Sequence, residues 1–81
     1  MTLKIISAED IIFQGEATAV HLPGVEGAFT VLNNHASLVS LLAPGEVTFE
    51  TSGNDEQHPA VSVQGGVVNV DRNVVSVCIF R

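Results

Sequence analysis

The sequence predicts an all-β protein folded as a β-sandwich or β-barrel, and three observations support this. Short apolar runs are interrupted every several residues by Gly, Pro, Asn or Asp, and several runs alternate between apolar and polar residues. Val is the commonest residue, while Trp and Tyr are absent. Alternation with period two between turn residues is typical of sandwiches and barrels, and β-branched side chains fit a pleated surface better than a helix. A chain of 81 residues is expected to form one domain, residues 1–81.

The first half of the chain contains four expected strands, each followed by turn-forming residues. They are residues 3–7, 11–13, 17–22 and 28–32. The third run ends at Pro23-Gly24 and the fourth at Asn33-Asn34, which are strong turn signals. Residues 9–13 are also compatible with a loop that packs its apolar side chains inward.

The second half contains five further expected strands. They are residues 38–42, 46–51, 60–64, 67–70 and 74–80. Periodicity alone does not distinguish a strand from a helical turn at 38–42, and we favour a strand because so short a helix is only marginally stable. Residues 71–73 are expected to turn a hairpin, since Asp and Asn can hydrogen-bond their own backbone. Residues 52–56 are expected to be a polar hairpin loop.

Two smaller features carry expectations of their own. Gly65-Gly66 is expected to serve a bend or bulge between sheets, with close approach of a ligand to the backbone as the alternative. Cys78, the only cysteine, lies in the apolar run 74–80 and is expected to fill the core as a small hydrophobic residue. A single cysteine also excludes an intrachain disulfide.

The charge balance argues against two classes of partner. The formal net charge is −6, and the only basic residues are Lys4, Arg72 and Arg81. Three separated cations cannot form the basic stripe that nucleic-acid binding requires, nor attract an anionic lipid surface. We therefore expect no nucleic acid as partner and no direct anchoring to lipid.

Residue chemistry gives little support to catalysis. No glycine-rich stretch is followed by the Lys and Ser or Thr of a phosphate loop. The three histidines, His21, His35 and His58, match no standard zinc spacing. The sequence therefore favours a small non-catalytic binding module with no cofactor and no metal. A small ligand-binding or metal-binding β-barrel, a metal-dependent enzyme that uses the histidines, and an acidic mimic of nucleic acid remain as alternatives.

Ordered sequence segments then indicate a family. The chain carries SAE at 7–9, FQGE at 13–16, LPGVEG at 22–27, NNHASL at 33–38, PG at 44–45, QGG at 64–66 and NVVSV at 73–77. In this order the segments resemble the N-terminal domain of the epsilon subunit of bacterial F-type ATP synthases. The resemblance covers essentially the whole chain.

The resemblance implies a fold, a role and partners. The fold is a flattened β-sandwich of about ten short strands in two sheets. The role is that of a rotor subunit of the central stalk, which couples proton- or sodium-driven rotation of the c-ring to the gamma subunit by protein contacts. The partners are gamma and the c-ring, with the catalytic alpha/beta hexamer contacted indirectly. The location is the cytoplasmic face of the bacterial plasma membrane, reached only through the complex.

The resemblance also implies two contact segments. Val25, Glu26, Gly27 and Ala28 match the family loop beside the c-ring, and Glu26 is a candidate partner for a cationic ring residue. A second set matches a segment near gamma and the ring. It contains Asn33, Asn34, His35, Ala36 and Ser40, with His35 at the position of a family histidine.

Three departures from the family pattern modify these expectations. Ala28 replaces an acid that is frequent in the family, which removes one ring contact. Residues 33–37 replace a Pro-Gly-His-Ala-Pro segment, so the turn is expected to survive through the backbone tolerance of Asn but to lose stiffness. The C-terminal helical hairpin of the family does not follow residue 81, so this chain is expected neither to inhibit ATP hydrolysis nor to bind ATP through it. A naturally short subunit and an excised domain both fit.

Overall fold

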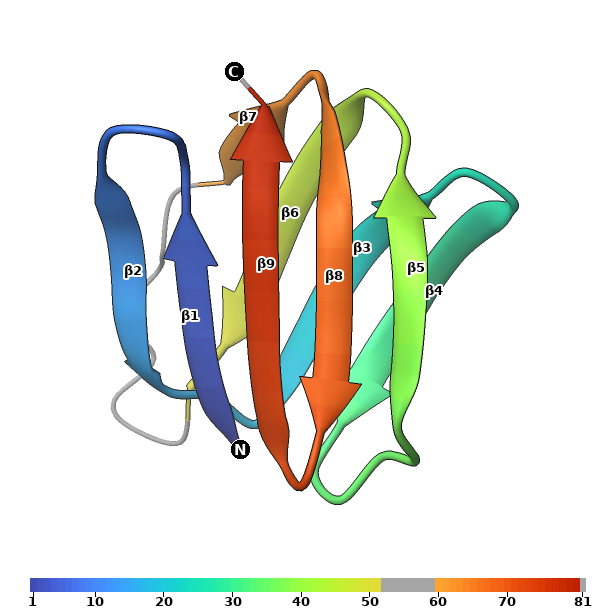
Figure 1. Ribbon diagram of the computed structural model, residues 1–81. Coiled ribbons are helices and arrows are strands. Elements are labelled where there is room, and N and C mark those ends of the chain that lie inside the picture. Colours follow the sequence, from blue (N-terminus) through green and yellow to red (C-terminus); the bar gives the residue numbers. More distant parts are fainter. Residues whose placement is uncertain (52–59, 81) are drawn as a thin grey trace.

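The computed structural model describes residues 1–51 and 60–80, which form nine strands in two facing layers (Figure 1). The first layer has the order β2-β1-β9-β8-β5, and the second has the order β7-β6-β3-β4. The first layer comprises β1 (Thr2–Ile6), β2 (Ile11–Glu16), β5 (Leu38–Leu42), β8 (Gly65–Asp71) and β9 (Val74–Phe80). The second comprises β3 (Ala19–Gly24), β4 (Gly27–Leu32), β6 (Gly45–Glu50) and β7 (Val61–Val63).

The two layers meet at one corner of the sandwich. There a single residue pair, Gly24 and Leu42, joins β3 to β5, so that hydrogen bonding continues from one layer into the other as one curled sheet. The predicted all-β class is confirmed, with nine strands in the described residues where about ten were expected. Residues 38–42 are a strand, as favoured above. Residues 11–16 also form a strand, so the alternative of a loop over residues 9–13 is wrong for most of that segment.

The first and last strands of the described chain lie side by side. β1 and β9 pair in parallel over five residues, from Thr2 and Val74 to Ile6 and Cys78, while the other recorded strand pairs are antiparallel. β9 therefore sits between β1 and β8 in the middle of the first layer (Figure 1). This position gives β9 a hydrogen-bonded neighbour along each of its two edges.

The core fills the space between the two layers with aliphatic side chains. Its fully buried members are Leu3, Ile5, Val20, Leu22, Val31, Val47, Val63, Val68, Val70, Val75 and Val77. They recur at every second position of their strands, which is the predicted period. Within the described residues no polar or charged side chain is buried. Burying each Val or Leu side chain contributes about 1.5–3 kcal/mol, so this interior is the main source of stability.

The hairpin between β8 and β9 has a tight turn of the type that matches sheet twist. Asp71 pairs with Val74, which leaves Arg72 and Asn73 as a two-residue loop. Their φ angles are 52° and 64°. Positive φ at both central positions defines a type I′ turn, and Asn tolerates it well. The predicted turn at residues 71–73 is confirmed.

Gly66 stands where two neighbouring backbones approach closely. The chain bends at Gln64 as it passes from β7 in the second layer to β8 in the first, as expected for this glycine pair. Gly66 has a φ of 157°, and a Cβ atom there would lie 2.3 Å from the carbonyl oxygen of Cys78. A side chain at this position would push β8 away from β9.

The prediction that Cys78 fills the core is wrong. Cys78 is exposed, whereas its neighbours Val77 and Ile79 are buried. Adjacent residues of a strand point to opposite faces, and the uninterrupted apolar run 74–80 conceals which face is which. The expected loop at residues 52–56 and the histidine His58 lie outside the described residues.

We predict that Gly66→Ala lowers the free energy of unfolding by more than about 3 kcal/mol, because it combines an unfavourable φ with a backbone clash. Gly27→Ala is the matched control: Gly27 also has a positive φ, 130°, but a Cβ atom added there would have no neighbour within 4 Å. It should cost about 1–2 kcal/mol. Urea denaturation of both variants measures the difference, and equal losses would contradict the role given to the Cys78 carbonyl.

Candidate functional site

The first predicted contact segment forms the tip of the hairpin between β3 and β4. Gly24 pairs with Gly27, so Val25 and Glu26 make up the turn. The Val25 N–H donates to the carbonyl oxygen of Leu41 at 3.0 Å, which holds the tip against β5. Glu26 is exposed, and the Val25 side chain is 54% exposed. The hairpin therefore presents one carboxylate and one apolar side chain from a fixed backbone.

A groove between β4 and β5 connects this tip to part of the second segment. It consists of two adjoining hollows of about 350 and 340 Å³ that share Phe29, Val39 and Ser40. Val25, Glu26 and Gly27 line one hollow, and His35 lines the other. The structure thus brings together five of the predicted residues, Val25, Glu26, Gly27, His35 and Ser40, along one groove.

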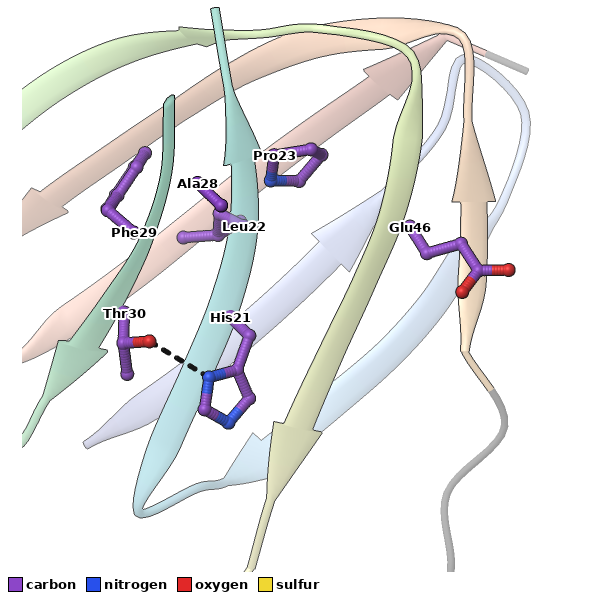
Figure 2. A pocket seen from close by; sticks show the side chains of 7 residues that line it. All are labelled: His21, Leu22, Pro23, Ala28, Phe29, Thr30 and Glu46. Atoms are coloured by element: carbon purple, nitrogen blue, oxygen red, sulfur yellow. Dashed lines mark hydrogen bonds between the residues drawn. The ribbon is translucent and has the colours of Figure 1, made fainter. Parts of the chain in front are cut away.

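Ala28 does not share that groove. It lines a third hollow on the outer face of the second layer, together with His21, Thr30 and Glu46 (Figure 2). The reason is again alternation, since the side chains of Ala28 and its neighbour Phe29 point to opposite faces of β4 and Phe29 lines the groove. The four residues predicted as one ring-contact loop therefore divide between two surfaces.

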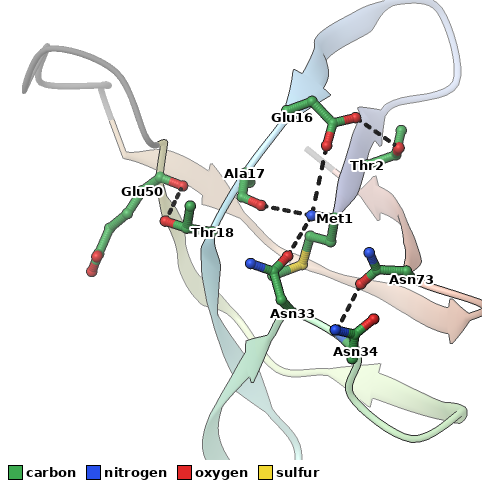
Figure 3. Close-up of polar contacts among 9 residues, drawn as sticks. All are labelled: Met1, Thr2, Glu16, Ala17, Thr18, Asn33, Asn34, Glu50 and Asn73. Carbon is green, nitrogen blue, oxygen red and sulfur yellow. Dashed lines mark hydrogen bonds and ion pairs between the residues drawn. The ribbon is translucent and has the colours of Figure 1, made fainter.

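The remaining predicted residues lie in the loop between β4 and β5, at the other end of these strands from the hairpin tip (Figure 1). The Asn34 N–H donates to Oδ1 of Asn73 at 2.8 Å, and the Ser37 hydroxyl donates to Oδ1 of Asp71 at 2.8 Å. Figure 3 shows the first of these bonds, and it also shows Asn33 accepting a hydrogen bond from the amino group of Met1. The loop thus gains attachments that offset the expected loss of stiffness.

The outer face of the second layer carries a polar cluster around His21. Its Nδ1 lies 2.9 Å from Oγ1 of Thr30, and its Nε2 lies 2.9 Å from Oε2 of Glu50. The cluster spans β3, β4 and β6, and Figure 2 shows the bond to Thr30. In residues 1–51 and 60–80, no three His, Cys, Asp or Glu side chains gather as a metal site would require.

Sequence reasoning missed a band of apolar side chains on the outer face of the first layer. Strand register aligns Leu41, Val67, Cys78 and Ile6 in one row across β5, β8, β9 and β1. Val39 and Phe80 flank this row, at positions two residues from Leu41 and Cys78 on the same face. The exposed fractions of Val39, Leu41 and Phe80 are 70%, 58% and 62%. We call these six residues the apolar band.

The signal that could have revealed the band is the failure of β9 and β5 to alternate. A strand with one solvated face should place polar residues at every second position. In 74–80 and 38–42, several outward positions are apolar as well. Contiguous exposed apolar surface of this kind marks interaction sites in soluble proteins.

The sequence profile of the family described as ATP synthase, Delta/Epsilon chain, beta-sandwich domain matches residues 1–80. The chain belongs to this family. Among its delta/epsilon relatives, the ATP synthase epsilon chain of Campylobacter fetus subsp. fetus is 47% identical over 77 residues, covering 95% of this chain and 58% of the relative. That of Nitratiruptor sp. is 42% identical over 73 residues, covering 90% and 55%. This chain therefore spans little more than half the length of the curated relatives it matches.

Solved structures of ATP synthases contain the same fold. A chain of the Euglena gracilis mitochondrial ATP synthase superposes with a TM-score of 0.87 at 26% identity, covering 98% of this chain and 49% of that one. A chain of the central stalk and c-ring structure from Tetrahymena thermophila superposes with a TM-score of 0.83 at 14% identity, with coverages of 99% and 63%. In the described part of this delta/epsilon family member, no helix has the length and apolarity needed to cross a membrane.

We predict that His21→Ala lowers the free energy of unfolding by about 1 kcal/mol, because it removes two partly exposed cross-strand hydrogen bonds. Ser62→Ala, at an exposed position of β7, should change it by less than about 0.5 kcal/mol. Urea denaturation at neutral pH measures both. A loss of about 3 kcal/mol for His21→Ala would show that the cluster contributes more than its exposed bonds account for.

Proposed function

We propose that this chain forms the β-sandwich domain, residues 1–81, of an epsilon-type subunit in the central stalk of a bacterial F-type ATP synthase. In this role it catalyses nothing. It couples rotation of the c-ring to the gamma subunit through protein contacts, at the cytoplasmic face of the plasma membrane. The support is membership of the delta/epsilon family, the epsilon chains among its relatives, and a similar fold in a solved central stalk and c-ring structure.

The apolar band is the observation that carries the proposed contact with gamma. A sandwich whose interior is already filled has no structural need for further apolar side chains on an outer face. Val39, Leu41 and Phe80 are more than half exposed there, and Lys4 is the nearest cation in the register, paired with Ser76. An apolar centre with few charges is typical of the buried part of a stable protein interface.

The hairpin tip and the groove beside it form the proposed contact with the c-ring. Val39 and Leu41 also line the hollow at the tip, so this contact would border the one proposed for gamma. Val25, Glu26 and Gly27 are presented together with Ser40, while His35 lies farther along the groove. Ala28 faces the other side of β4, so its contribution to the same contact is confined to the edge of the hairpin. Asn33, Asn34 and Ala36 lie in the loop that bears His35, and we propose that this loop contacts gamma or the ring. Loops on a rigid sheet suit a rotating joint, because they fit a partner without deforming.

A footprinting experiment tests the proposed gamma face. We expect a maleimide to modify Cys78 in the free 81-residue chain, since the thiol is exposed, and to modify it at least tenfold more slowly once gamma is bound, because interface cores exclude water. The control is Cys78→Ser/Ser62→Cys, which moves the thiol to the second layer and should remain reactive. Equal protection at both positions, or protection at neither, would refute this orientation. Mass spectrometry measures the rate.

Variants of the band supply a second measure of the same contact. Leu41→Asn should weaken binding to purified gamma by about tenfold or more, because it places an amide where an interface would bury an apolar group. Leu32→Asn makes the same change on β4 of the second layer, where Leu32 is 57% exposed, and should leave the affinity unchanged. Isothermal titration measures both, and equal effects would contradict the role of the band.

We further predict that Glu26→Lys slows association with the c-ring and removes part of its salt dependence, because a charge at the rim of an interface acts mainly on encounter. Glu9→Lys makes the same change of charge at an exposed turn far from the groove. Surface plasmon resonance with purified rings at two ionic strengths measures the rates. Identical behaviour of the two variants would remove Glu26 from the proposed contact.

A further inference from the structure

The loop that bears His35 is attached by two hydrogen bonds to the end of the hairpin between β8 and β9. Oδ1 of Asn73 accepts a hydrogen bond from the backbone N–H of Asn34, and Oδ1 of Asp71 accepts one from the hydroxyl of Ser37. The donor–acceptor distance is 2.8 Å in both. The two attachment points flank His35 on either side. Asp71 and Asn73 lie more than thirty residues farther along the chain, so only the tertiary fold brings the two segments together.

The turn is a firm support for this loop. Arg72 and Asn73 form a type I′ turn, which fixes the backbone on which the Asn73 side chain stands. The carbonyl oxygen of Asn73 also accepts the N–H of Thr2 at 3.0 Å, which ties the turn to β1. Since a backbone N–H can only donate, the Asn73 amide must present its oxygen to Asn34.

His35 itself is attached to its own loop. Its N–H donates to the carbonyl oxygen of Leu32 at 3.2 Å, and its Nδ1 lies 2.7 Å from the carbonyl oxygen of Ala36. The ring is exposed, yet its direction follows that of the loop. Whatever orients the loop therefore orients the imidazole.

We propose that Asp71 and Asn73 are positioning residues: they hold the loop in the one orientation in which His35 meets a partner protein. The identity of the partner rests on the function proposed above, while the ordering of the loop does not. Ordering a contact loop before binding lowers the entropic cost of association, so affinity should depend on residues that touch no partner.

Solvent-exchange NMR on the 81-residue chain tests the ordering. Asn73→Gly keeps a residue suited to positive φ but removes the acceptor, and it should speed exchange of the Asn34 and His35 amides about tenfold. Ser37→Ala and Asp71→Ala should each have a similar effect at His35. The double variant Ser37→Ala/Asp71→Ala should be no faster than either single one, because both remove the same bond. The amides of Val68 and Val77 should not change.

Conservative variants distinguish positioning from a general loss of structure. Asp71→Asn and Asn73→Asp each keep an oxygen acceptor and should exchange like the wild-type chain. Ser62→Ala, in β7, is the neutral control. Unaltered exchange in Asn73→Gly and Asp71→Ala would overturn the proposal, and so would faster exchange in the conservative pair.

Binding to the cognate gamma subunit and c-ring completes the test. Asn73→Gly and Asp71→Ala should bind about tenfold more weakly while their unfolding midpoints stay close to wild type. If the wild-type chain does not bind, the proposed function fails, and the exchange rates still report on the loop. If the wild-type chain binds and variants with a faster-exchanging loop bind equally well, the positioning role is overturned and the proposed function stands.

Discussion

The structure depends on one packing constraint, the closure of two thin layers over a shared row of branched aliphatic side chains. Leu3, Val68 and Val77 are fully buried between the layers, and no described polar side chain joins them. So small a domain has room for this core and for little else. Contact with other molecules is therefore left to the outer faces, the strand ends and the loops.

The same alternation that builds the core also builds the surface. In β9, Val75, Val77 and Ile79 point inward, which obliges Cys78 and Phe80 to point outward. Register then aligns outward residues of four strands into the apolar band. A protein that acted alone would gain solubility by placing polar residues at these positions. Apolar residues at outward positions therefore agree with the proposed function, in which a partner covers this face.

The loop at residues 33–37 illustrates how stiffness can be supplied in different ways. In the family pattern that this segment resembles, proline restricts the backbone directly. In this chain Asn34 adopts a φ of 64°, and side chains of the neighbouring turn bind the loop. Hydrogen bonds can thus replace covalent restriction, provided that the fold supplies a partner at the right place.

The sequence by itself determined the all-β class, most strand positions and the turn at 71–73, because period-two alternation and turn chemistry are local properties of the chain. Its ordered motifs also indicated the family. Only the tertiary structure decided which face of an uninterrupted apolar run is buried, and here the sequence misplaced Cys78. The tertiary structure likewise separated Ala28 from the groove and brought Asp71 within hydrogen-bonding distance of Ser37. Burial and register depend on strands far apart in sequence, so no local pattern contains them.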